Sequence, residues 1–234
     1  MHGLSYDISF KDQMASANGL LVVRRPDIPI PELQVETIKV AGRDGVLVSD
    51  IKRYEAIEIT VAFNFMTSPE RWNEHLRMVK EWASGSGRLI LGDDTNYYYK
   101  ALYTQASVAE RTSRRIGNLT VTFVCDPYQY RIDGDVEYEP ADCAYNGYDV
   151  CHPAYIIVGN GTATLTVNGS SVTAAVNGKV TIDSDLMIAY DADGNVANTS
   201  TIGDYEGLYL QPGDNEIDIT DGYTLTMIPR WRHI

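Results

Sequence analysis

Hydrophobic and polar residues alternate most clearly in the segment Glu55-Ala-Ile-Glu-Ile-Thr-Val-Ala-Phe-Asn-Phe65, where every second residue from Ile57 onward is large and apolar. Successive side chains of a strand point to opposite faces, so these five apolar residues share one face of a half-buried antiparallel strand. Two shorter apolar segments, 34–40 and 46–48, flank Gly42-Arg-Asp-Gly45. They predict a hairpin, because Asp-Gly readily adopts the positive φ of a tight turn.

One helical pattern stands out, from Ser68 to about Ser84. Ser68 and Pro69 suit the first positions of a helix, and Gly85 can end it in a left-handed conformation. The apolar stripe that would pack on a sheet is Trp72, Leu76, Val79 and Ala83. Further strands are predicted at 88–91, 97–104 and 119–125, with a turn at 92–96.

From Pro153 onward the pattern consists of short apolar segments separated by Asn-Gly, Asp-Gly or Pro-Gly. Short strands with such turns predict a β-sandwich. The expected strands are 154–158, 163–167, 172–176, 179–182, 186–190, 208–210, 216–219 and 223–228. We therefore expect a mainly β protein with one principal α-helix, in which an N-terminal antiparallel β-sandwich or barrel-like domain with the helix precedes a C-terminal β-sandwich.

Charge changes the picture by indicating where one domain ends. Residues 1–133 hold 16 Lys/Arg and 17 Asp/Glu, whereas residues 134–234 hold 3 and 15. This step predicts two modules, 1–133 and 153–234, joined by a linker over 134–152. The net charge of −13 argues against nucleic acid or an anionic membrane as a partner, since both require clustered Lys and Arg.

The cysteines indicate the compartment in which the protein is made. Cys125, Cys143 and Cys151 cannot all pair within the chain, and the N-terminal residues do not resemble a secretory signal. No apolar run approaches the roughly 18 residues of a membrane span. We expect a protein made in a reducing cytosol.

The candidate chemistry is weak. Asp93 and Asp94, placed before three tyrosines, could form an acid or metal pair, but adjacent strand residues point to opposite faces, which favours a turn. The segment 191–195 resembles a calcium loop, but its glycine stands fourth and residue twelve is Ile202, so a hairpin turn is expected and other calcium sites stay open. Cys143, Cys151 and His152 lack a zinc spacing.

Accordingly we predict no catalytic, cofactor-binding or metal-binding residue, and a protein that is not an enzyme. Two carboxylates of a glycosidase need no sequence motif, so a wall-degrading enzyme stays a distant alternative. The tyrosine content keeps carbohydrate binding open, because aromatic rings give flat apolar faces with a polar handle.

Several motifs in order make the first module resemble a known family. They are Val40-Ala-Gly-Arg-Asp-Gly-Val-Leu-Val-Ser-Asp50, Tyr54-Glu55 before the 57–65 strand, Glu81-Trp-Ala-Ser-Gly-Ser-Gly-Arg-Leu-Ile-Leu-Gly-Asp-Asp94, Tyr98-Tyr-Lys-Ala101 and Val121-Thr-Phe-Val-Cys-Asp-Pro-Tyr-Gln-Tyr130. Over nearly all of residues 1–133 the chain resembles the N-terminal domain of the siphovirus phage distal tail protein family.

The second module is similar to the C-terminal half of that family, a galectin-like or carbohydrate-binding-module-like sandwich. The motifs are Ile182-Asp-Ser-Asp185, Leu210-Gln-Pro-Gly-Asp-Asn-Glu-Ile217 and Tyr223-Thr-Leu-Thr-Met-Ile-Pro-Arg-Trp-Arg232. The resemblance implies a homo-hexameric ring at the virion tail tip, assembled in the bacterial host cytoplasm. The ring would join the tail tube protein to the tail-associated hub protein and dock receptor-binding proteins for host attachment.

Two stretches are candidates for the ring interface: the hairpin tip Gly42, Arg43, Asp44 and Gly45, and the run Tyr97, Tyr98 and Tyr99. Tyr97 and Tyr99 share one face of a strand and Tyr98 takes the other, so one face should be core. The alternative function is a carbohydrate-binding module that contacts host saccharide directly. It predicts an exposed aromatic row on the second module, including Tyr205 and Tyr209.

Overall fold

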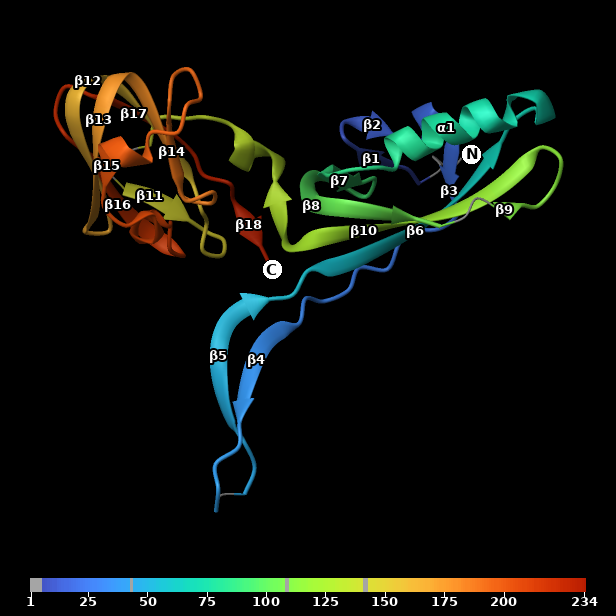
Figure 1. The fold of residues 1–234 in the computed structure, drawn as a ribbon, viewed down its shortest axis with the longest axis horizontal. Coiled ribbons are helices and arrows are strands. Elements are labelled where there is room, and N and C mark those ends of the chain that lie inside the picture. The colour runs from blue at the N-terminus through green and yellow to red at the C-terminus, as the bar shows by residue number, and fades with distance from the viewer. Residues whose placement is uncertain (1–5, 43, 108–109, 141–142) are drawn as a thin grey trace. The chain divides into compact units, whose positions relative to one another are not determined.

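The computed structural model describes residues 6–42, 44–107, 110–140 and 143–234, apart from the side chains of residues 49–52. The chain forms two compact units, one comprising residues up to Gln129 together with Ile234, the other Tyr130–His233. Both consist mainly of antiparallel strands, and α1 (Trp72–Trp82) is the one α-helix within the described ranges (Figure 1). The predicted mainly β fold with one principal helix is confirmed.

The first unit is built on one antiparallel sheet, with the strand order β2-β1-β7-β8-β10-β6-β3 and with β9 paired to β10. A separate two-stranded sheet, β4-β5, forms the hairpin that we call the arm. The strands are β1 (Ile8–Phe10), β2 (Gln13–Met14), β3 (Leu20–Val22), β4 (Leu33–Ile38), β5 (Leu47–Tyr54), β6 (Ile57–Met66), β7 (Gly87–Leu91), β8 (Asp94–Ala106), β9 (Glu110–Arg111) and β10 (Ile116–Arg131).

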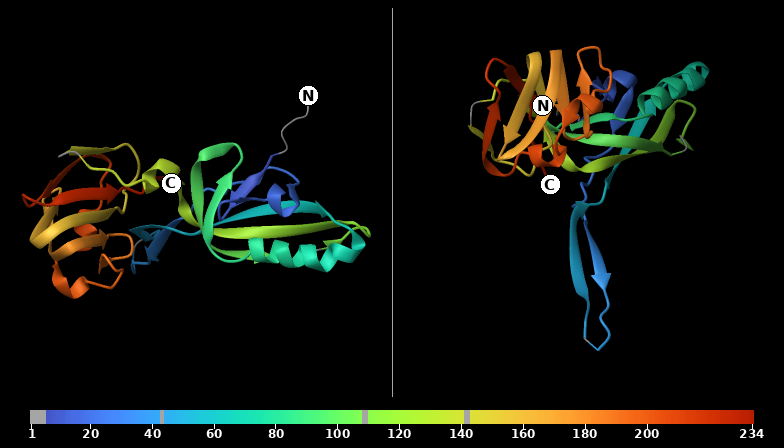
Figure 2. Two further views of the ribbon diagram at one scale, coloured as in Figure 1. Left: turned by 90° about the horizontal axis from the view of Figure 1, so that it is seen from above. Right: turned by 60° about the vertical axis from the view of Figure 1, so that its left-hand side comes forward.

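The core of this unit lies between the sheet and α1, which covers one face of it (Figures 1 and 2). The five alternating residues of β6, from Ile57 to Phe65, are at most 5% exposed, as predicted. Trp82 from α1 packs edge-on against Phe10 and Phe63, with ring centroids 6.0 and 5.7 Å apart. Edge-to-face aromatic pairs of this kind add specific geometry to the burial of large apolar surfaces.

The predicted helix begins differently from the expectation. Residues Pro69–Arg71 form a 3-10 turn before α1, and the Ser68 side chain makes no capping hydrogen bond. Proline at the first position still fits, because its missing N–H would have had no partner inside the helix.

The second unit contains a sheet with the strand order β11-β16-β12-β13-β14, with β15 paired to β13 and β17 to β12. The Arg131 N–H, at the end of β10, donates to the Trp231 carbonyl at 2.9 Å, beside β18. The strands are β11 (Cys143–Asn146), β12 (Ala154–Val167), β13 (Ser170–Asp183), β14 (Ile188–Asp191), β15 (Thr201–Ile202), β16 (Gly213–Ile219), β17 (Thr224–Ile228) and β18 (Arg232–His233).

Two expected pairs of short strands are each one long strand. β12 and β13 run through Asn160-Gly161 and Asn177-Gly178 without turning, and Asn160 pairs with Asn177 while Gly159 pairs with Gly178. Glycine is needed there for a different reason: a Cβ on Gly159 would lie 2.4 Å from the ring of Tyr223, which packs across the hairpin. The turn of this hairpin is at Asn168 and Gly169, both with positive φ.

The expected strand at 208–210 is also absent from the structure. Tyr205–Leu208 form a 3-10 turn, and Leu210 makes only an isolated bridge with Cys151. The side chains of Tyr205, Leu208 and Leu210 are all buried. The segment is therefore apolar because it packs in the core, although it does not form a strand. The segment expected as a linker, 134–152, contributes β11 to the second sheet.

Candidate assembly surface

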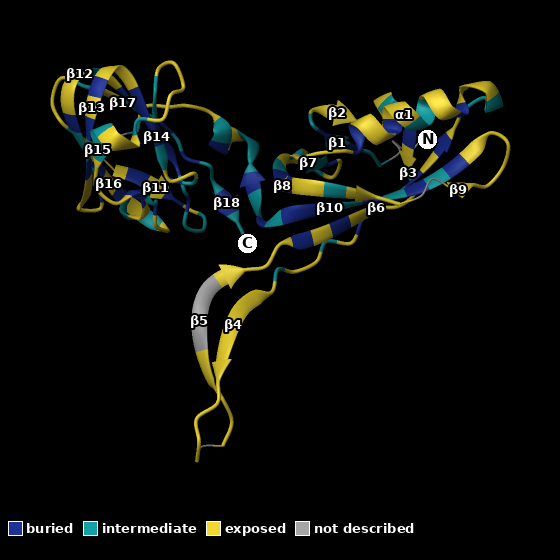
Figure 3. Ribbon diagram, viewed as in Figure 1, coloured by how far each residue is buried: buried dark blue, intermediate teal, exposed yellow. Residues whose placement is uncertain are grey.

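The arm is exposed along its whole described length. Every residue of β4 is exposed, and the two strands pair only with one another (Figure 3). At its tip Gly42 and Gly45 have φ values of +80° and +83°, as the Asp-Gly turn requires, and Asp44 is exposed. Arg43, also expected at the ring interface, lies outside the described residues.

Apolar side chains occur on both faces of the arm. Ile38 pairs with Leu47, and Thr37 pairs with Val48, so these two pairs lie on opposite faces. Large apolar side chains of the arm are 37–59% exposed: Leu33, Val35, Ile38, Val40, Val46, Leu47, Val48 and Tyr54. A two-stranded hairpin alone is marginally stable in water, and neither face of this one is covered by the sheet of its own unit.

The three tyrosines of β8 occupy different environments. Tyr99 is 6% exposed and belongs to the core of the first unit, where burial raises its pKa to about 12. Tyr98, on the opposite face, is 7% exposed and lies beneath the Arg88 guanidinium, 5.1 Å from the ring centroid. Tyr97 is half-buried. Both faces of the run are therefore largely covered, and β8, which carries the tyrosines, lies apart from the far end of the arm (Figure 1).

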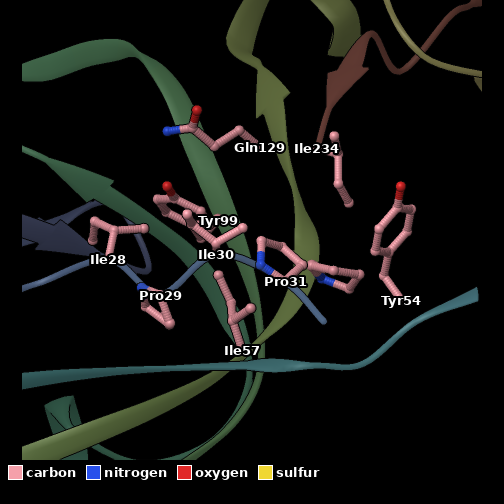
Figure 4. A pocket seen from close by; sticks show the side chains of 10 residues that line it. Ile28, Pro29, Ile30, Pro31, Tyr54, Ile57, Tyr99, Gln129 and Ile234 are labelled. Carbon is pink, nitrogen blue, oxygen red and sulfur yellow. The ribbon is translucent and has the colours of Figure 1, made fainter. Parts of the chain in front are cut away.

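An apolar hollow of about 370 Å³ lies at the base of the arm (Figure 4). Ile30 at its rim is 89% exposed, and Tyr99 forms part of its wall. The lining residues are Ile28, Pro29, Ile30, Pro31, Tyr54, Ile57, Tyr99, Pro127, Gln129 and Ile234. Sequence reasoning missed this hollow because its walls come from segments far apart in the chain. The cluster of Pro26, Pro29 and Pro31 beside exposed apolar residues was the one available signal.

Asp93 and Asp94 have separate partners. Asp93 lies in the turn between β7 and β8 and forms an ion pair with Arg25, whose hydrogen bond lowers the pKa of this carboxyl group. Asp94 begins β8 and accepts a hydrogen bond from the Gln129 amide at 3.2 Å. The predicted turn is therefore correct for Asp93, whereas Asp94 is the first residue of the strand β8.

The calcium-like segment is a turn stabilised by its own side chains. Asp191 accepts hydrogen bonds from the backbone N–H groups of Asp193 and Asn195, both at 2.9 Å, and Gly194 has φ +83°. Across the described part of the chain, no three His, Cys, Asp or Glu residues are placed to hold a metal ion. Cys125, Cys143 and Cys151 form no disulfide.

A buried ion pair fixes the end of the hairpin β12–β13. Asp183 is 2% exposed and accepts two hydrogen bonds from Arg230, at 2.8 and 2.7 Å. Burial raises the pKa of Asp183, but hydrogen bonds from Arg230 and from the Leu186 and Asp185 N–H groups outweigh it and lower the pKa. Both partners belong to motifs that carried the family resemblance.

A second buried polar group explains the remaining C-terminal motif. Asn215 is fully buried, donates to the carbonyls of Gln211 and Gly213, and accepts from the Gln211 N–H at 2.8 Å. It also accepts from Asn168 at the turn of the hairpin, at 2.8 Å. These residues hold a loop and a turn together, which is a structural role.

The tyrosines considered for saccharide binding do not form an exposed row. Tyr205 is 8% exposed and belongs to the core of the second unit. Tyr209 stacks on His152 with ring centroids 3.9 Å apart.

Of the helices within the described ranges, none is long and apolar enough to cross a membrane.

Comparisons with known proteins agree with this geometry. Residues 18–125 match the family model of the phage tail protein RIFT-related domain. No curated protein matches the chain significantly. Among solved structures, the chain is similar to the SPP1 Dit protein (gp 19.1), described as a paradigm of the hub adsorption apparatus in phages infecting Gram-positive bacteria. The TM-score is 0.69 at 14% identity, over 97% of this chain and 98% of that one.

The match of residues 18–125 includes the arm, all of β6, α1 and most of the first sheet, so it covers the elements that form the candidate surface. The predicted resemblance to the siphovirus distal tail protein family is confirmed: residues 18–125 match the phage tail protein RIFT-related domain, and the fold of the chain is similar to that of the SPP1 Dit protein.

Proposed function

We propose that this phage tail protein forms a homo-hexameric ring at the tail tip, which joins the tail tube protein to the tail-associated hub protein. The observation that carries this proposal is the arm, whose apolar side chains are exposed on both faces although the rest of its unit has a well-packed core. Exposed apolar surface of this extent is typical of interaction sites.

Among the described residues, Gly42, Asp44 and Gly45 at the arm tip and the half-buried Tyr97 of β8 are the candidate ring contacts most accessible to a neighbouring subunit. Tyr98 and Tyr99 would contribute through the surfaces that they support, since Tyr99 lines the hollow. The second unit, with its acidic composition, would remain outside the ring contact and dock receptor-binding proteins. Assembly would take place in the cytoplasm of the bacterial host.

Light scattering of the purified protein, with and without the tail-associated hub protein, tests the ring. We expect a closed oligomer whose mass is six times the 26.0 kDa of one chain, and a central pore in negative-stain electron micrographs. A protein that stays monomeric at high concentration, alone and with the hub protein, would contradict the proposal.

A further inference from the structure

The first unit presents two apolar surfaces that its own fold leaves uncovered. One is the arm, and the other is the hollow at its base. The arm cannot fill the hollow of its own chain, because Pro31 and Tyr54 at its base line that hollow and β4 and β5 extend away from the sheet (Figure 1). At roughly 3.3 Å per residue, the tip lies on the order of 30 Å from the first pair of the arm, Leu33 and Tyr54.

We propose that the arm of one copy docks in the hollow of the next copy, so that each chain gives one apolar protrusion and receives another. This inference rests on the proposed ring and names its contact. It is a heterologous contact, because two different surfaces meet, and such contacts repeated around an axis close into a ring.

The arm and the hollow are both mainly apolar. None of the side chains that line the hollow is charged, so a charged partner would lose hydration there without gaining a counter-ion. The arm offers uncharged Val, Ile and Leu side chains on both faces, and the exposed Glu36 of β4 lies on the same face as Ile38. The second unit is a poor occupant by the same criterion, since residues 134–234 carry 15 Asp/Glu against 3 Lys/Arg.

The size of the arm suits an interface. Its strands have six and eight residues, and with the tip they approach the roughly 20–30 residues that one side of a standard protein interface contains. Burying apolar side chains stabilises an interface in proportion to the area removed from water, so several half-exposed side chains of the arm together favour its ordering in an assembly. The hollow, at about 370 Å³, has room for only a few of them, which leaves the other face for a second contact.

Two variants separate the two halves of this contact. Ile30→Asp places a carboxylate at the rim of the hollow, at a side chain that is 89% exposed and therefore dispensable for the fold. Leu47→Asp/Val48→Asp places one carboxylate on each face of the arm. The matched control is Leu186→Asp/Val196→Asp, which changes two side chains of the second unit that are 59% and 69% exposed.

We expect the wild type and the control to assemble, and both test variants to be monomers with unchanged circular dichroism. Mixing the two monomers restores one contact, between the intact arm of Ile30→Asp and the intact hollow of Leu47→Asp/Val48→Asp. Light scattering of the mixture should therefore show a dimer of twice the 26.0 kDa chain mass and no ring.

The outcomes distinguish this contact from the ring itself. If the wild type is monomeric under all conditions, the proposed function fails. If the wild type assembles and either variant assembles equally well, the ring stands and the arm or the hollow belongs to another partner, such as the tail tube protein. If both variants are monomers but their mixture yields no dimer, or if either has lost its folded spectrum, the pairing of arm and hollow is overturned.

Discussion

The protein contains two long antiparallel hairpins that differ in what supports them. In β12–β13, Leu165, Val167 and Val172 are fully buried, and the hairpin lies between other strands of its sheet. In β4–β5, by contrast, apolar side chains are exposed on both faces. Both hairpins have positive-φ residues at their turns, so turn chemistry does not distinguish them. The comparison indicates that the local sequence is sufficient to specify a hairpin, whereas packing against other strands determines whether the hairpin is stable without a partner.

The largest expected effect comes from removing the ion pair at the end of the supported hairpin. Arg230→Ala leaves the Asp183 carboxylate, 2% exposed, without its partner. Losing one member of a buried ion pair costs about 3–5 kcal/mol, and we expect that loss in the free energy of unfolding of the second unit, measured by urea denaturation. Arg71→Ala is the control, because its pair with Glu74 is exposed and should contribute little to the free energy of unfolding. Equal losses in the two variants would contradict the structural account.

A matched truncation compares the two hairpins directly. Leu165→Ala in β12 removes fully buried methyl groups and should cost about 2–5 kcal/mol of unfolding free energy. Val48→Ala in β5, at a side chain 59% exposed, should change the unfolding free energy of the monomer by less than about 0.5 kcal/mol. The Val48→Ala monomer is best measured in the Ile30→Asp background, where we expect assembly to be absent. A large cost for Val48→Ala there would mean that the arm packs on its own chain.

Acid should weaken the two units over different pH ranges. His75 packs against Phe65 with ring centroids 5.0 Å apart, and burial together with nearby Arg71 lowers the pKa of His75 below 6.5. Because the unfolded chain binds this proton more readily, the stability of the first unit is complete above about pH 6.5 and falls as the pH drops toward the folded-state pKa.

The second unit should hold its stability to lower pH. The pKa of Asp183 is depressed below 3.8, so its contribution is complete above about pH 4 and is lost only as the pH falls further. Hydrogen exchange resolved by peptide, from pH 7 to 3, can follow the units separately. We expect α1 to lose protection before β13, and His75→Gln to remove the earlier step. Simultaneous loss in both units, unaffected by that substitution, would show that these two groups do not control the response.

Much of the first unit could be predicted from sequence. The period-two pattern of Ile57–Phe65, the apolar stripe of the helix and the Asp44-Gly45 turn each depend on residues close together in the sequence. Such features can be predicted without knowledge of the tertiary structure. β1, β2 and β3 were not predicted, because strands of two or three residues are too short to show a period. In the second unit, Asn160-Gly161 resembled a turn, although its glycine serves the close approach of Tyr223.

Of the candidate surface, the hairpin tip could be predicted from the sequence and the hollow could not. The hairpin tip has a dipeptide signature, so Gly42 and Gly45 could be found. The hollow joins Ile28, Tyr99 and Gln129, which are brought together only by the sheet, and no local pattern encodes that proximity. The tyrosine run was ambiguous for a physical reason: strand alternation says that the two faces differ, but not that both are covered.

Hydrogen exchange of the arm amides tests most directly whether the arm is ordered by assembly. In the assembled wild type we predict strong protection of Leu33–Ile38 and Leu47–Tyr54, and in monomeric Ile30→Asp rapid exchange of the same amides, with β12 and β13 equally protected in both. Equal protection of the arm in the assembly and in the monomer would contradict the account, since it would show that the arm is stable without a neighbour.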